Sequence, residues 1–210
     1  MKGVGKIIKS KSKSRMERKM ERTRRKIITA AITLFDKHGI DETTMEEISE
    51  TADVARGTIY NHFSSKEAII SEYIEQSMQE KQPVRLQKLH ELSNTYERVK
   101  YVFMQLISGI QKKKELFERF LAHRMHKILS FNQNESEKAD FSILAYKIIE
   151  MGQKSGEIRT DIPLYILEDL FEFAFAEAIK PLYVEPDNFN QSESIQNCID
   201  LFMNGVKADN

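Results

Sequence analysis

The chain has 210 residues, of which 40% are hydrophobic, and its 32 Lys and Arg are balanced by 32 Asp and Glu, so the formal net charge is zero. The length fits one or two globular domains, and the apolar runs are too short to cross a bilayer, so we expect a cytoplasmic protein with no membrane partner. A single cysteine, Cys198, excludes an intrachain disulfide and fits a reducing compartment.

The zero net charge hides an uneven distribution. Residues 1–26 hold twelve Lys and Arg and two Glu, so this segment carries +10 and residues 27–210 carry −10. A basic end on an acidic body favours binding DNA through that end. We expect residues 1–20 to be a flexible basic arm that adds phosphate or minor-groove contacts. The alternative is a solvated tail that only aids solubility.

Residues 44–67, TMEEISETADVARGTIYNHFSSKE, have the pattern of two short helices joined by a tight turn. Thr44 is a good N-cap, and Glu47, three residues later, completes a capping box. Ile48 and Ala52 recur at helical spacing and predict a buried face. This order of elements is typical of a helix-turn-helix.

The second helix of the pair is expected from about Arg56 to Phe63. Ile59 and Phe63 are four residues apart, so they share a face that points inward. Isolated helices this short are marginal, so the polar face indicates a surface kept for contact. The alternative is a helical hairpin that only packs. The residues expected on the outside are Arg56, Gly57, Thr58, Tyr60, Asn61 and His62.

The stretch from Thr23 to Ile70 resembles the TetR (tetracycline-repressor) family of bacterial transcription regulators. The resemblance includes RRKIITAAITLFDKHGIDETT, in which Ala31, Phe35 and Gly39 match the family's pattern, and continues through GTIYNHFSSKEAI. In the remaining chain only the helical layout and GQKSGEIRTDIP are similar.

The resemblance implies an all-α fold of about nine helices. A three-helix N-terminal helix-turn-helix DNA-binding domain is expected at residues 21–66, and a larger helical ligand-binding and dimerisation domain at residues 67–210. Members of the family are homodimers that bind a palindromic operator in double-stranded DNA. The resemblance also implies a small-molecule effector whose binding changes the spacing of the two reading heads and releases DNA. The chain is then a nucleoid-associated repressor of a prokaryote.

The resemblance implies a role for individual residues of the motif. Thr58 and Asn61 lie three apart on one face, so both can enter one groove as base readers, beside Arg56 and Gly57. Phosphate contacts, which set register rather than sequence, are implied for a second set. That set is Thr44, at the positive end of its helix, with Tyr60, His62 and Lys66. The plainer alternatives are a half-buried aromatic for Tyr60 and a solvated ring for His62.

The helical pattern continues from Lys66 through Met78 and is expected to stop near Pro83. The resemblance implies that this connecting helix transmits ligand binding to the reading head as a rod. Further helices are expected at residues 86–92, 96–111, 116–131 and 141–153, and Ser155-Gly156 is a good helix stop after the last of these.

Two apolar helices close the chain. Asp161 is expected to cap the first, with Pro163 close to its first turn, and its apolar stripe is too wide for a helix that buries one face. One side should face its own core and another a partner. With a final helix at residues 195–206, this predicts a homodimer held by a four-helix bundle. The alternative is that both helices are buried in one subunit. The expected interface residues are Leu167, Leu170, Phe171, Phe175, Ile179, Ile195, Ile199 and Phe202.

The resemblance implies a ligand cavity between the middle helices, although a stripe of Phe and Met more often forms core. Met adapts to varied shapes, which favours an apolar or amphipathic effector. Arg124 lies close to His123 and His126 in sequence, and these side chains can orient a polar end of the ligand. The candidate lining residues are Phe103, Met104, Ile107, Phe120, Arg124, Met125 and Tyr146.

No catalytic residue, metal or cofactor is expected. His123 and His126 share a helix face, but a metal site needs further ligands. There is no glycine-rich phosphate loop and no nucleophile elbow. Cys198, in the predicted dimer helix, is either a redox sensor or a small buried apolar group. Three function classes remain: a ligand-responsive repressor, a non-specific nucleoid-type DNA-binding protein, and a helical small-molecule carrier with an inactive reading head. The polar face of residues 56–62 favours the first.

Overall fold

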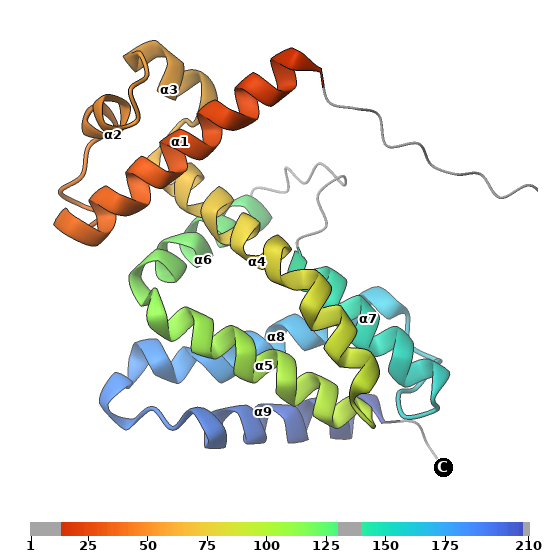
Figure 1. The fold of residues 1–210 in the computed structure, drawn as a ribbon. Coiled ribbons are helices and arrows are strands. Elements are labelled where there is room, and N and C mark those ends of the chain that lie inside the picture. The colour runs from red at the N-terminus through yellow and green to blue at the C-terminus, as the bar shows by residue number, and fades with distance from the viewer. Residues whose placement is uncertain (1–13, 130–139, 208–210) are drawn as a thin grey trace, which may run out of the picture. The chain divides into compact units, whose positions relative to one another are not determined.

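The computed structural model describes residues 14–129 and 140–207, with the side chains of 124–129 and 140 excepted. Within these residues the chain forms nine α-helices and a short 3-10 turn, which confirms the predicted all-α class (Figure 1). The described residues divide into two compact units with the boundary after Glu72, inside a helix, and the predicted domain bounds stay a prediction. The helices are α1 (Arg15–His38), α2 (Met45–Thr51), α3 (Arg56–His62), α4 (Lys66–Glu91), α5 (Thr95–Lys112), α6 (Lys114–Leu129), α7 (Asp140–Lys154), α8 (Leu164–Val184) and α9 (Gln191–Val206).

Helix α1 begins at Arg15, inside the range expected for a flexible arm of residues 1–20. The Ser14 hydroxyl accepts the Glu17 N–H at 3.1 Å, and the Glu17 carboxylate accepts the Ser14 N–H at 2.6 Å. This capping box satisfies two N–H groups and fixes the start of the helix. The arm prediction is therefore corrected for residues 15–20, while residues 1–13 lie outside the described part.

Helices α2 and α3 form the predicted helix-turn-helix. Thr44 and Glu47 make the expected capping box at the start of α2. The turn contains Asp53 at φ +54°, a left-handed conformation that Asp adopts more readily than most residues. Ile59 and Phe63 are 0% and 3% exposed, which confirms that they anchor α3 to the core of the unit.

Helix α4 continues through Pro83, so the expected stop there and the separate helix at residues 86–92 are wrong. A proline inside a helix leaves the carbonyl four residues earlier, on Gln79, without its N–H partner. Pro83 and Gln79 are both on the exposed side, where water can satisfy that carbonyl. Close to Pro83, the buried Arg85 guanidinium donates to the Met78 carbonyl at 3.5 Å.

The core of the second unit is built from α5, α7, α8 and α9. Phe171 is fully buried, and its ring centroid lies 5.2 Å from Phe103, 5.5 Å from Phe141 and 5.7 Å from Phe202. Each such pair stabilises the fold by about 0.5–1.5 kcal/mol beyond its area burial. Helices α5 to α9 lie near their predicted ranges, although Phe131 of the expected fourth range is outside the described residues. No helix in the described part is both long and apolar enough to cross a membrane.

The buried Arg98 side chain joins α5 to the end of α4. Its Nε and Nη2 donate to the carbonyls of Leu89 at 3.0 Å and Leu92 at 2.8 Å, which satisfies groups that α4 leaves open. Glu157, after α7, accepts the N–H of Thr95 at 2.6 Å. These bonds connect three elements at one end of the unit.

The expected cap of α8 is wrong. Asp161 forms a two-pronged ion pair with Arg159, with Nε–Oδ1 and Nη2–Oδ2 distances of 2.7 and 2.6 Å. The N-cap position belongs to Pro163, which makes no side-chain capping bond.

We predict that Gly152→Ala destabilises the protein. A Cβ on Gly152 would lie 2.7 Å from both Ile158 Cδ1 and Thr95 Oγ1, so α7 or the segment after it must shift, at a cost of about 1–3 kcal/mol. Gly205→Ala is the matched control, because a Cβ there meets nothing within 4 Å and the change raises helix propensity. Urea unfolding of both variants measures the difference, and equal stability for the two would contradict the packing described.

Candidate DNA-reading surface and ligand cavity

The outer face of α3 is polar and open. Arg56, Gly57, Tyr60 and Asn61 are exposed, with Tyr60 at 48%, while Thr58 is partly buried. A Cβ built on Gly57 would meet nothing within 4 Å, so the helix surface is unobstructed there. All four predicted base readers therefore lie on one short helix whose outer face is open to solvent.

Glu46 of α2 belongs to this surface, and the sequence analysis missed it. Its carboxylate accepts from Arg56 Nε at 2.9 Å and lies 3.5 Å from the Tyr60 hydroxyl. The hydrogen bond from Arg56 lowers the pKa of Glu46, and the same bond raises the pKa of Arg56, so both groups stay charged. No pattern in the sequence joins α2 to a residue ten positions later, although an acid in the first turn of α2 was visible.

Lys66 was assigned to a phosphate contact, and the structure gives it a different role. Its ammonium donates to the carbonyls of Ile40 at 2.7 Å, Thr43 at 2.8 Å and Asp41 at 3.2 Å. An ammonium has three hydrogens, and all three are used within the loop before α2. Lys66 therefore holds that loop, which corrects the predicted phosphate contact.

The Thr44 side chain is used inside the unit, and the His62 ring is partly buried there. The Thr44 hydroxyl accepts the Glu47 N–H at 3.2 Å and donates to the Glu47 carboxylate at 3.0 Å. Burial, followed by the charge of Arg24, lowers the pKa of His62, which keeps its ring neutral at neutral pH. Neither feature excludes DNA, but both leave less of these side chains for a phosphate than predicted.

Arg24 holds the end of α3. Its Nη1 donates to the His62 carbonyl at 3.1 Å and its Nε donates to Glu72 at 2.9 Å, while the guanidinium carbon lies 4.5 Å from the centre of the Phe63 ring. Arg24 was counted only as one charge of the basic end, because its partners are distant in sequence.

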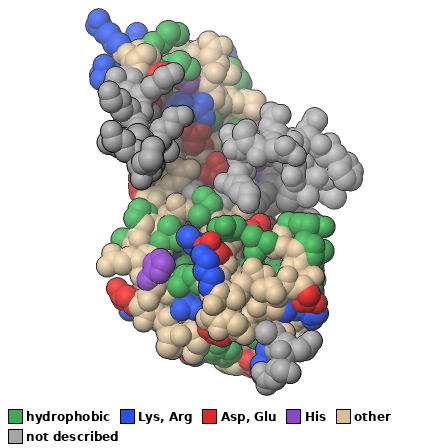
Figure 2. All heavy atoms as spheres, turned by 90° about the vertical axis from the view of Figure 1, so that its right-hand side faces the viewer, with side chains coloured by type: hydrophobic (Ala, Val, Ile, Leu, Met, Phe, Trp, Pro, Cys, Tyr) green, Lys and Arg blue, Asp and Glu red, His purple; other side chains and the backbone are tan. Residues whose placement is uncertain are grey.

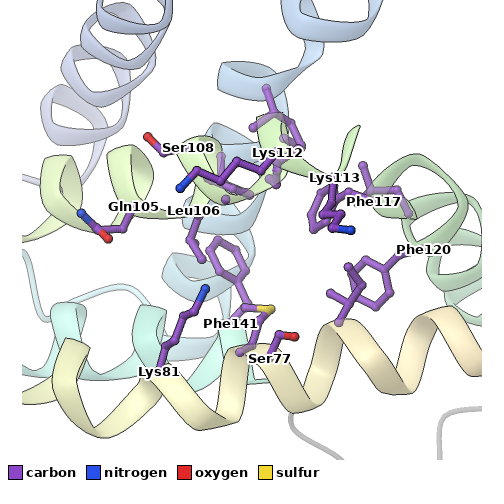
Figure 3. A pocket seen from close by; sticks show the side chains of 18 of the residues that line it. Ser77, Lys81, Gln105, Leu106, Ser108, Lys112, Lys113, Phe117, Phe120 and Phe141 are labelled. Atoms are coloured by element: carbon purple, nitrogen blue, oxygen red, sulfur yellow. The ribbon is translucent and has the colours of Figure 1, made fainter. Parts of the chain in front are cut away.

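The second unit contains a cavity of about 520 Å³, which is within the range of small-molecule sites. Figure 3 shows its apolar lining, with Leu106 from α5, Phe117 and Phe120 from α6 and Phe141 from α7. Its polar groups come mainly from α4 and α5. They are Tyr73, Ser77, Lys81, Arg85, Gln105, Ser108, Lys112, Lys113 and Glu172.

The lining carries an excess of positive charge. Lys81, Arg85, Lys112 and Lys113 face one acid among the described lining residues, Glu172, whose carboxylate accepts the Ser142 hydroxyl at 2.6 Å. In Figure 3, Lys81 extends from α4 toward α5. The cavity therefore suits an apolar body that carries a negative group.

The predicted ligand residues are only partly in the right place. Phe120 lines the cavity, whereas Phe103 and Ile107 are fully buried in the core and do not line it. Met104 is 43% exposed and, like Tyr146, is outside the lining. The side chains of Arg124 and Met125 lie outside the described part.

The predicted dimer residues point inward in seven of eight cases. Their side chains pack inside the unit, which corrects that assignment: Leu167, Phe171, Phe175, Ile179, Ile195, Ile199 and Phe202. Leu170 is the exception at 38% exposed, and it shares the outer face of α8 with Ile166 at 43% and Phe173 at 63%. Helix α8 thus has the two apolar faces that its sequence indicated, but the exposed face is not the one that most of the predicted interface residues occupy.

The described residues form neither a metal site nor a reactive thiol site. Among the described residues, no group of three or more His, Cys, Asp and Glu is arranged to hold a metal ion. Cys198 is partly exposed, and burial raises the pKa of its thiol, followed by the charge of Glu177, so it stays protonated.

Comparison with known proteins agrees with this arrangement. Residues 27–73 match the family model "Bacterial regulatory proteins, tetR family". The chain is 41% identical over 51 residues to the probable acrEF/envCD operon repressor of Escherichia coli (strain K12), and this match spans 24% of the chain and 23% of that relative.

Two solved structures share the fold over nearly the whole chain. The first is Thermus thermophilus FadR, a TetR-family transcriptional repressor in complex with lauroyl-CoA, with a TM-score of 0.71, 24% identity and coverage of 89% of this chain and 96% of that one. The second is RolR in complex with resorcinol, with a TM-score of 0.66, 20% identity and 91% coverage of each chain. Residues 27–73 are therefore similar to the regulatory domain of the tetR family, and the chain shares its fold with these two structures.

Proposed function

We propose that this protein is a repressor that binds a palindromic operator as a homodimer and is released from DNA by a small-molecule effector. The observation that carries the proposal is the open polar face of α3, held in a helix-turn-helix that matches the family model. Because α3 is anchored by Ile59 and Phe63 on its other side, its polar residues are presented together. A second copy related by a two-fold axis would present the same face to an inverted half-site.

Asn61, Thr58 and Arg56 are the proposed base readers. An Asn side chain can pair with adenine and an Arg side chain with guanine through two hydrogen bonds each, and such contacts discriminate between bases. Tyr60 and His62 are the proposed phosphate contacts. Glu46 competes with DNA for the Arg56 guanidinium. Arg56 can therefore bind a base only by leaving the Glu46 carboxylate for the acceptor atoms of that base.

The outer face of α8 is the proposed dimer surface. Ile166, Leu170 and Phe173 follow helical spacing, and Tyr165 beside them is 64% exposed. On α9, Leu201 is a further exposed apolar side chain of this unit, at 76%. Exposed apolar groups gathered on one helix face are typical of a protein–protein interface. This surface replaces the buried residues that the sequence analysis named.

The cavity of the second unit is the proposed effector site. Its apolar interior and its Lys and Arg groups suit an amphipathic molecule with a negative end. The related fold of Thermus thermophilus FadR was solved with lauroyl-CoA, which has this chemistry. We therefore propose an effector of that class for this chain.

Selection of bound fragments from a random duplex pool tests the proposed function. We expect an inverted repeat, because two copies of α3 read the two halves. Asn61→Ala should lower the preference for the selected site by about 1–3 kcal/mol and leave the affinity for random duplex nearly unchanged. Asn197→Ala, an exposed asparagine on α9, is the matched control. Fragments with no shared motif would contradict a sequence-specific reader.

Phe173→Glu should convert the dimer to a monomer and abolish tight operator binding. The substitution places a charge in the centre of the proposed apolar interface. Val84→Glu on α4 is the control, because Val84 is 68% exposed and lies on another helix. Sedimentation equilibrium measures the mass of each variant, and a Phe173→Glu protein with the mass of the wild type would reject this surface.

Lauroyl-CoA is the probe for the effector site. We expect it to weaken operator binding, and Lys81→Glu should raise the concentration needed by about tenfold, as expected when a charge-assisted hydrogen bond is lost. Lys88→Glu, outside the lining, is the control. Fluorescence anisotropy of labelled operator gives both curves. Release by a strongly charged non-aromatic metabolite alone would contradict an amphipathic effector.

A further inference from the structure

The first three turns of α1 carry a row of positive charges on one face. The positions follow the spacing i, i+3, i+4, i+7, i+10 and i+11, which keeps them within about a third of the helix circumference. All are exposed, and Figure 2 shows Lys and Arg side chains projecting from the surface of this unit. We call this row the α1 basic stripe: Arg15, Arg18, Lys19, Arg22, Arg25 and Lys26.

Nearby acids neutralise little of the stripe. Glu17 lies on the other side of the helix and is used in the capping box with Ser14. Among the described residues, the stripe takes part in one ion pair, between Arg25 and Glu21 at 2.9 Å. At least four full positive charges therefore face solvent together.

The fold itself gains nothing from this arrangement. Like charges three and four residues apart on a helix destabilise it by about 0.2–0.5 kcal/mol per pair. Cations in the first turn also oppose the helix dipole, whose positive end is there. Arg15 and Arg18 are in this unfavourable position. A negatively charged partner would remove both costs.

The stripe leads into a shallow basic hollow of the same unit. It is lined by three cations and one acid, together with three Thr and two Ala: Arg22, Arg25, Lys26, Asp53, Thr29, Thr33, Thr51, Ala30 and Ala52. Ammonium, guanidinium and hydroxyl groups are the side-chain donors that most often contact phosphate oxygens. The hollow borders the turn of the helix-turn-helix.

We propose that the α1 basic stripe binds the phosphate backbone of duplex DNA outside the bases that α3 reads. The stripe is about 16 Å long from Arg15 to Lys26, which corresponds to about five base pairs along the duplex. It precedes residue 27, where the match to the family model begins, so the matched domain does not account for it. The inference rests on the proposed function only in taking DNA as the partner.

The test uses the full chain and the variant Arg18→Gln/Arg22→Gln. Both residues are exposed and have no ion pair among the described residues, so the fold should be kept, which circular dichroism and thermal unfolding check. Lys88→Gln/Lys154→Gln removes the same charge from the second unit and is the control. Fluorescence anisotropy over a series of KCl concentrations gives the dissociation constant for the selected operator and for random duplex.

We expect the stripe variant to bind both duplexes more weakly and to lower the slope of log Kd against log salt by about 2, or about 0.9 per lost phosphate. The control should keep the wild-type slope. Shortening the DNA outside the operator should weaken the wild type but not the stripe variant. An unchanged slope in the stripe variant would falsify the proposal, as would equal sensitivity of both proteins to shortening.

These results separate the stripe from the reading head. If the wild type selects no inverted repeat, the proposed function fails, yet the stripe is still tested by the slope on random duplex. If the wild type selects a repeat and the stripe variant keeps its slope, the stripe fails alone. A stripe variant that loses binding to an acidic protein but binds DNA like the wild type would also overturn the proposal.

Discussion

The reading surface depends on Arg24, a single side chain of α1. A helix of seven residues is not stable alone, so α3 must be fixed by its surroundings. Ile59 and Phe63 fix its inner face, and Arg24 fixes its end by donating to the His62 carbonyl. The same guanidinium pairs with Glu72 of α4 and covers the Phe63 ring. A planar group with five donors can make all these contacts at once, which an ammonium cannot.

In the helix-turn-helix unit, the sequence correctly predicted the contacts between residues that are close together in the chain. Thr44 and Glu47 are three residues apart, and Ile59 and Phe63 four, so spacing alone indicates their contacts. Lys66 was misread because its partners are carbonyls 23 to 26 residues earlier, and a lysine beside a recognition helix looks like a phosphate contact. Arg24 and Glu46 were missed for the same reason.

In the second unit, the sequence predicted how many faces α8 has but not which face is outside. Leu167 and Leu170 are chemically identical, and only packing against α7 and α9 buries one and exposes the other. The cavity was harder still, because its lining comes from five helices. Lys81 and Arg85 were not among the candidate lining residues, although both lie on α4 and line the cavity.

In the first unit, the charges on α1 and the charges beside α3 are expected to act on different properties, the first on affinity for DNA and the second on selectivity between sequences. Cations on α1 attract any duplex, whereas the reading face of α3 contains the acid Glu46 paired with Arg56. A DNA sequence that offers Arg56 no acceptor gains nothing by separating this pair and brings a phosphate-rich surface toward a carboxylate. A sequence that offers a guanine replaces the carboxylate with two base acceptors. Under the proposed function, we expect Glu46 to lower the affinity for wrong sites more than for right ones, which is how an acid on a DNA-binding surface can increase specificity.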